Sequence, residues 1–242
     1  MKQRIFKIKE NIALNQSIMK MTLVGDTSGI KCGQFVNLQI SGLYLRRPIS
    51  VCDCVGDELT LVYKIVGKGT EMMSKMQDGE LDVLTELGNG YDTSLSGDNP
   101  LLVGGGVGVP PLYMLAKTLI SEGKKVSVIL GFNTKDEIFY EDEFKALGAK
   151  VQVTTVDGSY GVKGFVTDAL DMDYSYTYSC GPEPMLKALY KTSKTSGQYS
   201  FEERMGCGFG ACMGCSCKTI TGYKRICKEG PVLSKEEILW EA

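Results

Sequence analysis

The residues best suited to chemistry are cysteines near the end of the chain. Five of the nine cysteines lie between positions 207 and 227. Cys207, Cys212 and Cys215 follow the spacing C-x4-C-x2-C and Cys227 lies further on, an arrangement typical of plant-type [2Fe–2S] clusters. Glycines at 206, 208, 210 and 214 lack a Cβ atom, so backbone amides can approach the sulfur atoms. The pattern therefore predicts a [2Fe–2S] cluster held by four thiolates.

Two other uses of these cysteines stay open, a structural zinc site and a set of redox thiols. Structural zinc usually takes short C-x2–4-C pairs on two knuckles, whereas only one such short pair is clear here. Cys217 is expected to be a non-ligand, because Cys215 already completes the x2 gap from Cys212. The cysteines outside the cluster are by default small buried hydrophobic residues, namely Cys32, Cys52, Cys54 and Cys180.

Three further segments could bind phosphate groups. Glycines at 104, 105, 106 and 108 lie between an apolar run and Pro110, which places bare backbone at the start of a helix. Arg46 and Arg47 begin the run Arg-Arg-Pro-Ile-Ser, and arginine is a good phosphate partner. Residues 67–70 read Gly-Lys-Gly-Thr before a helix. The alternatives are a tight turn, a solvated strand end and an N-cap, respectively.

Composition narrows the function. Among 242 residues, 27 Lys and Arg oppose 29 Asp and Glu, so nucleic acid is not an expected partner. The chain has no histidine, which excludes a Ser-His-Asp triad, a histidine-ligated zinc and any imidazole base. Residues 99–116 carry no charge, but their glycines and prolines favour strand, turn and helix over a membrane span. The N-terminus does not read as a signal peptide, so we expect a cytoplasmic protein without a membrane partner.

The elements that must position these residues change along the chain. Residues 1–97 contain short strand-like runs at 17–24, 34–40, 48–54, 58–66 and 80–84 and a helix near 70–76, which predicts an antiparallel β-barrel. Residues 98–197 alternate strands (101–103, 125–131, 150–156, 174–180) with helices (110–121, 136–147, 165–170, 182–194). This alternation predicts a parallel α/β sheet with ligands at the carboxyl ends of its strands. With residues 198–242 as a small cluster domain, we predict an α+β multidomain protein of three parts.

Together the motifs resemble the ferredoxin–NADP reductase superfamily in order and spacing. The resemblance rests on the run 47–50, on 69–70, on the glycines at 104–108 and on Cys180-Gly181-Pro182-Glu183-Pro184-Met185. With the C-terminal cysteines, the chain is similar over essentially its whole length to electron-transfer subunits of class B dihydroorotate dehydrogenases. The resemblance implies an FAD-binding barrel, a nicotinamide-binding α/β domain and a [2Fe–2S] domain.

The resemblance also implies roles for residues. Arg47, Pro48, Ile49 and Ser50 would bind FAD, with Ser50 near the flavin ring. Val62, Tyr63 and Lys64 would lie along the flavin, and Gly69 and Thr70 would hold the pyrophosphate. Gly104, Gly105, Gly106 and Gly108, with Cys180, Gly181, Pro182 and Glu183, would contact the nicotinamide cofactor, NAD. Cys180 would lie near the reactive edge of the flavin.

The resemblance further implies a partner, because the chain lacks the (β/α)8 pattern of a dihydroorotate-oxidising barrel. An FMN-containing catalytic subunit would pass electrons through the cluster to FAD and then NAD⁺, in pyrimidine biosynthesis, within a heterotetramer of two of each chain. The cofactors would carry the chemistry, so no side chain is expected to be catalytic. The alternatives are a subunit of another reductase complex, such as a ferredoxin–NADP transhydrogenase or a sulfide- or hydrogen-linked reductase, and a zinc-stabilised interaction protein.

Overall fold

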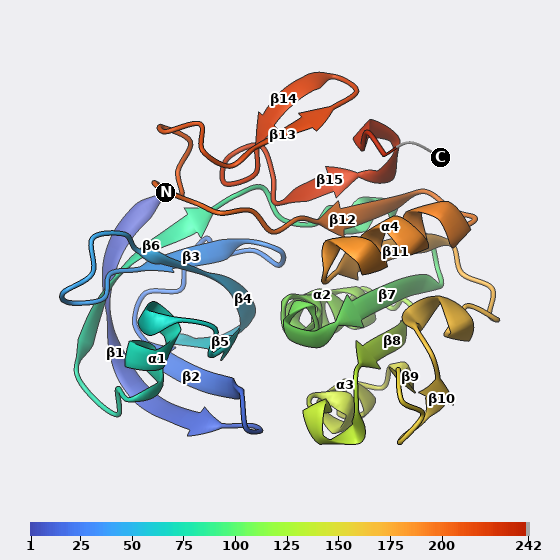
Figure 1. Cartoon of the computed structure of the whole chain (residues 1–242), viewed down its shortest axis with the longest axis horizontal. Helices are drawn as coiled ribbons and strands as arrows, with labels where there is room; N and C mark the ends of the chain where they lie inside the picture. The colour runs from blue at the N-terminus through green and yellow to red at the C-terminus, as the bar shows by residue number, and fades with distance from the viewer. Residues whose placement is uncertain (241–242) are drawn as a thin grey trace.

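The computed structural model describes residues 1–240 and consists of two lobes joined along one side, with the C-terminal segment lying across both (Figure 1). The first lobe is a closed antiparallel barrel with strand order β1-β2-β5-β4-β3-β6. Its elements are β1 (Lys2–Ala13), β2 (Ile18–Val24), β3 (Phe35–Leu38), β4 (Arg47–Val55), β5 (Glu58–Lys64), α1 (Lys68–Ser74) and β6 (Glu80–Leu87). The predicted barrel is therefore confirmed.

Strand β1 is the one barrel strand that the sequence pattern does not predict. Its charged residues alternate with residues that point into the barrel, among them Phe6 and Ile8, which are buried. Period-two alternation is what a strand with one buried side requires. Lys2, Lys7 and Lys9 of this strand are exposed, whereas Arg4 is buried and donates to the Thr85 hydroxyl at 2.8 Å.

The second lobe is a seven-stranded sheet with the order β10-β9-β8-β7-β11-β12-β15. All neighbours are parallel except β12 and β15, as the predicted α/β alternation requires. Its strands are β7 (Pro100–Gly105), β8 (Ser127–Phe132), β9 (Lys150–Thr155), β10 (Val162–Lys163), β11 (Tyr176–Cys180), β12 (Gly197–Ser200) and β15 (Val232–Ser234). The α-helices are α2 (Pro111–Ser121), α3 (Glu141–Ala146) and α4 (Glu183–Thr192), with short 3-10 turns η1 (Thr93–Leu95), η2 (Gly106–Gly108), η3 (Lys135–Glu137), η4 (Val166–Ala169) and η5 (Lys235–Glu237).

The predicted helix over 136–147 is wrong in its first half. The chain forms the turn η3, becomes extended at Ile138, and starts α3 only after Tyr140, whose φ of 67° lies in the left-handed region. Phe139 and Tyr140 are adjacent and both buried in the core of this lobe. Because the left-handed backbone of Tyr140 cannot continue a right-handed helix, the helix begins only at Glu141.

The C-terminal segment is built onto the central sheet. The chain leaves the sheet after β12, forms the cysteine loop and the hairpin of β13 (Ser216–Thr219) and β14 (Gly222–Arg225), and returns as β15. The proposed boundary at 197 falls in β12, and the last two residues of the proposed domain 198–242 lie outside the described residues. Within residues 1–240, no helix is long and apolar enough to cross a membrane.

Candidate cofactor sites

The two predicted FAD segments of the barrel meet at Arg47 and Gly69. A Cβ atom on Gly69 would lie 1.9 Å from Nε of Arg47, so only glycine leaves room for this side chain. The Arg47 Nη1 atom donates to the carbonyls of Leu45 at 2.5 Å and Arg46 at 3.2 Å. The Arg47 guanidinium lies against the glycine backbone at the first turn of α1. A cation beside an uncovered backbone suits an anionic phosphate group, so these residues fit the pyrophosphate of FAD.

Thr70 acts as a local cap. Its hydroxyl accepts hydrogen bonds from the amides of Val66 at 3.0 Å and Gly67 at 3.3 Å and donates to the Gly67 carbonyl at 3.1 Å. These bonds order the loop that leads into α1. The structure therefore gives the Thr70 side chain the capping function that was the alternative interpretation of this motif, and its hydroxyl occupies the amides of Val66 and Gly67.

The other predicted flavin residues differ in their orientation. The Tyr63 ring lies inside the barrel, where its hydroxyl donates to Oδ1 of Asn11 at 3.0 Å, so only its backbone can lie along a flavin. Ile49 also packs against the barrel core. Val62 belongs to the core shared with the second lobe. Pro48 and Ser50 are half-buried, and Lys64 is exposed.

The predicted nicotinamide segments also lie together. Gly104 of β7 is in register with Cys180 of β11, at the carboxyl ends of both strands. A Cβ on Gly108 would lie 2.3 Å from the Cys180 carbonyl oxygen, and one on Gly105 would lie 3.2 Å from Pro182 Cδ. Two glycine-containing turns thus pack against each other at the edge where parallel sheets bind ligands. The turn η2 contacts strand β5, and the arrow of β7 points toward the barrel (Figure 1), so this edge adjoins the predicted FAD strands.

Cys180 carries a neutral thiol. Burial raises its pKa to about 12, although a hydrogen bond with Ser200 acts in the opposite direction. A neutral, half-buried thiol contributes packing and a weak hydrogen-bond donor. It does not supply a base near neutral pH.

The four predicted cluster cysteines form two pairs. Within residues 1–240 no three His, Cys, Asp or Glu side chains converge on one metal ion. Instead, the backbone places Cys212 beside Cys207, with the Cys212 amide nitrogen 3.5 Å from Cys207 Sγ, and Cys227 beside Cys215. The amide of Cys227 also points at Cys215 Sγ at 3.4 Å. Two pairs of thiols match the need of a two-iron cluster for two cysteines at each iron.

Backbone amides of the cysteine loop are directed at the sulfur atoms. The amide nitrogens of Ala211 and Cys212 lie 3.2 Å and 3.5 Å from Cys207 Sγ. Burial alone would raise the pKa of Cys207, but backbone hydrogen bonds from Cys212, Phe209 and Ala211 outweigh it and lower the pKa to about 6. Stabilised thiolate is the form that binds metal, so the loop fits an iron–sulfur cluster.

Cys217 stands apart from both pairs. It lies in β13 opposite Lys224, packs against the core beneath the hairpin, and directs its thiol at the Lys218 carbonyl at 3.6 Å. Burial raises its pKa above the ordinary value of 9.0. These observations support the prediction that Cys217 is not a ligand.

Two residues with contacts in this region have no role in the sequence prediction, Asn37 and Arg225. Asn37, on β3, is buried; its Nδ2 donates to the Cys207 carbonyl at 3.2 Å, and its Oδ1 has no hydrogen-bond partner. The only signal for Asn37 is a polar residue within the apolar run 35–38. Arg225, on β14, donates from Nη1 to the Gly210 carbonyl at 2.6 Å.

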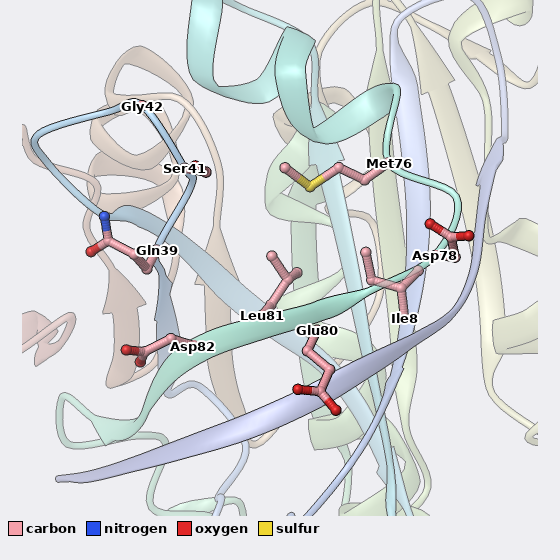
Figure 2. A pocket seen from close by; sticks show the side chains of 9 residues that line it. All are labelled: Ile8, Gln39, Ser41, Gly42, Met76, Asp78, Glu80, Leu81 and Asp82. Carbon is pink, nitrogen blue, oxygen red and sulfur yellow. The ribbon is translucent and has the colours of Figure 1, made fainter.

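A hollow of about 560 Å³ on the barrel is not the predicted FAD site. Figure 2 shows it between Gln39, Ser41 and Gly42 on one side and Asp78 and Ile8 on the other. Its lining includes three carboxylates, those of Asp78, Glu80 and Asp82, which do not suit an anionic pyrophosphate. Arg46 pairs with Asp82 at 3.0 Å, whereas the side chain that lies against Gly69 is that of Arg47.

The fold and the sites define a reductase with a flavin barrel, a nicotinamide-binding sheet and a thiolate loop for an iron–sulfur cluster. Residues 102–191 match the oxidoreductase NAD-binding domain, and residues 202–239 match the iron–sulfur cluster binding domain of dihydroorotate dehydrogenase B. The chain belongs to the family of electron transfer subunits of dihydroorotate dehydrogenase B (NAD(+)). It is 45% identical to the Bacillus pumilus subunit, with 98% of each chain covered, and 45% identical to the Fusobacterium nucleatum subunit, with 96% of each covered.

Solved structures agree with this fold. An NADH-dependent reduced ferredoxin-NADP oxidoreductase matches with a TM-score of 0.88 and 30% identity, over 97% of this chain and 90% of that one. A ferredoxin NADP+ reductase from Neisseria gonorrhoeae, solved with bound FAD and NADP, matches with a TM-score of 0.68 and 16% identity, over 83% of this chain and 100% of that one. The second match concerns the fold alone.

Proposed function

We propose that this chain carries electrons from an FMN-containing dihydroorotate dehydrogenase subunit to NAD⁺, by way of a [2Fe–2S] cluster and FAD, in pyrimidine biosynthesis. The observation that carries the proposal is the placement of Cys207 beside Cys212 and of Cys215 beside Cys227, with the cysteine loop bonded to the barrel at Asn37. The 45% identity to subunits of this enzyme supports the same reaction.

The chain's own residues bind and orient the cofactors. Cys207, Cys212, Cys215 and Cys227 hold the cluster, and Arg47 with the turn at Gly69 holds the FAD pyrophosphate. The strand 48–50 and the backbone of 62–64 lie along the flavin. The turns at 104–108 and 180–183 receive NAD. When bound, the cluster transfers single electrons and FAD gathers two for a hydride transfer.

The partner docks where electrons must enter, on the cysteine loop and the adjoining hairpin. Phe209 and Met213 of the loop and Tyr223 of the hairpin are exposed apolar side chains in this region. Exposed apolar residues grouped in this way favour a protein interface. The proposed assembly is a cytoplasmic heterotetramer of two of each chain, which light scattering of the purified complex measures directly.

A second candidate function is electron transfer between NAD(P) and ferredoxin. It is favoured by the 30% identity to the NADH-dependent reduced ferredoxin-NADP oxidoreductase over nearly the whole chain. The two functions share this chain's cofactors and differ in the donor. The partner that co-purifies therefore distinguishes them.

The test is anaerobic co-expression with the FMN-containing catalytic subunit. The proposal expects co-purification, flavin and iron–sulfur absorption between ~400 and ~600 nm, and NADH formation on adding dihydroorotate and NAD⁺. A colourless chain containing zinc would overturn the redox function. A chain loaded with both cofactors that ignores dihydroorotate but exchanges electrons with ferredoxin would favour the second candidate.

A further inference from the structure

One peptide unit of the cysteine loop is held at both ends. Nη1 of Arg225 donates to the Gly210 carbonyl oxygen at 2.6 Å, and the Ala211 nitrogen lies 3.2 Å from Cys207 Sγ. The oxygen and the N–H belong to the same planar trans peptide, so they point in opposite directions. The guanidinium, the peptide and the sulfur atom therefore form one continuous chain of hydrogen bonds.

The guanidinium is itself fixed by Glu229. Arg225 Nε donates to both carboxylate oxygens, at 3.1 Å and 2.9 Å, and Nη2 pairs with Oε1. The Arg225 amide also donates to Glu229 Oε2 at 2.8 Å. A bidentate pair restricts both side chains to one geometry. The Glu229 contacts thus leave Nη1 facing the loop, where it donates to the Gly210 carbonyl.

The loop conformation at this peptide depends on a glycine at position 210. Gly210 has a φ of 91°, in the left-handed region, and a Cβ atom there would lie 2.6 Å from Lys228 Cδ. Arg225 stands opposite Ser216 in the hairpin, and the next amide, of Ile226, donates to the Cys215 carbonyl at 3.1 Å. The segments that carry the two thiol pairs therefore meet at Arg225.

We propose that Arg225 is a positioning residue that raises the reduction potential of the cluster by orienting and polarising the 210–211 peptide toward Cys207. One-electron reduction adds one negative charge to the cluster, and a directed amide backed by a cation stabilises that charge. Hydrogen bonds in a chain strengthen one another, so the effect of the guanidinium reaches the sulfur through the peptide. Glu229 opposes the charge of Arg225 while it fixes the geometry. This inference rests on the cluster site of the proposed function.

The experiment is an EPR-monitored redox titration of the complex, with iron, sulfide and FAD content measured on the same samples. Arg225→Met removes the donor and the charge, so the midpoint potential of the cluster should become more negative. Glu229→Gln keeps one of the two oxygens that accept from Arg225 and removes the opposing charge, so the potential should become less negative. Arg225→Lys keeps the positive charge but lacks the guanidinium geometry, so its cluster midpoint potential should lie between those of wild type and Arg225→Met.

Lys224→Gln is the matched control, because it removes a cation from the next position of β14, where Lys224 pairs with Glu237 instead. Its cluster potential should stay at the wild-type value, and the FAD potential should be unchanged in every variant. Wild-type cluster potentials in Arg225→Met and Glu229→Gln at full iron content would overturn the inference and leave the proposed function standing. Arg225→Met could lose its cluster altogether, and the test then depends on Glu229→Gln. A cluster midpoint potential in Glu229→Gln that is equal to or more negative than that of wild type would overturn the inference. Wild-type protein that never binds iron would overturn the proposed function itself.

Discussion

The side-chain amide of Asn37 donates a hydrogen bond to the main-chain carbonyl of Cys207, 3.2 Å away and 170 positions later in the chain. A Cβ atom on Gly208 would lie 2.3 Å from the same Nδ2 atom, so the loop approaches this closely only because the residue is glycine. On the barrel, Asn37 stands opposite Pro48 of the proposed FAD motif. One buried side chain therefore connects the two proposed redox sites.

Asn37→Ala should loosen the cysteine loop without releasing FAD. One net hydrogen bond contributes about 1 kcal/mol, which corresponds to roughly fivefold faster loss of cluster iron to a chelator. The measurement is the decay of iron–sulfur absorption after a chelator is added anaerobically. Gln39→Ala is the control, since the Gln39 amide donates to the Leu43 carbonyl within the barrel. Equal rates of iron loss in both variants would show that the Asn37 contact does not hold the loop.

Arg47→Ala should weaken FAD binding by roughly tenfold to a hundredfold, because a charge-assisted hydrogen bond contributes about 1.5–3 kcal/mol. Flavin fluorescence released during gel filtration measures the loss. Arg46→Ala is the matched control, because Arg46 pairs with Asp82 rather than lying against Gly69. Full flavin content in Arg47→Ala, or equal loss in Arg46→Ala, would remove the role assigned to Arg47.

The reduction of an artificial acceptor by NADH should show no ionisation of Cys180 between pH 6 and 9. Burial raises the pKa of this thiol to about 12, above its ordinary value of 9.0, so it stays protonated throughout that range. Cys180→Ser should therefore change the amplitude of the rate and leave the shape of its pH profile unchanged. If the pH–rate profile of the wild type shows an ionisation with a pKa between 6 and 9, and this ionisation is lost in Cys180→Ser, the thiol of Cys180 is not neutral in that range.

Most of the fold could be predicted because its signals are local. Alternation in strands such as Glu58–Lys64 and the switch to βα units after residue 98 reflect which side of each element is buried. The first half of helix 136–147 failed because the backbone of Tyr140 is left-handed, which periodicity does not reveal. Strand β15 was missed because three residues are too few to form a pattern.

The sequence predicted some residues of the candidate sites and missed others. Cysteine spacing and glycine runs carry their chemistry in the sequence, so Cys207 and Gly104 could be singled out directly. Asn37 contacts the Cys207 carbonyl from a strand far away in the sequence, and Arg225 acts through the Gly210 carbonyl. No rule of residue spacing predicts such contacts. The sequence prediction did not specify where the Tyr63 ring points, because strand register decides that it faces the barrel interior.

The central claim is tested most directly by a pair of serine substitutions in the complex with the catalytic subunit. Cys212→Ser removes a proposed ligand, so it should abolish NADH formation from dihydroorotate while FAD content and NADH oxidation by an artificial acceptor persist. Cys217→Ser removes the cysteine that packs against the core, so iron content and both activities should remain. Dihydroorotate-dependent NADH formation at the wild-type rate in a Cys212→Ser complex without cluster would contradict electron transfer through the cluster.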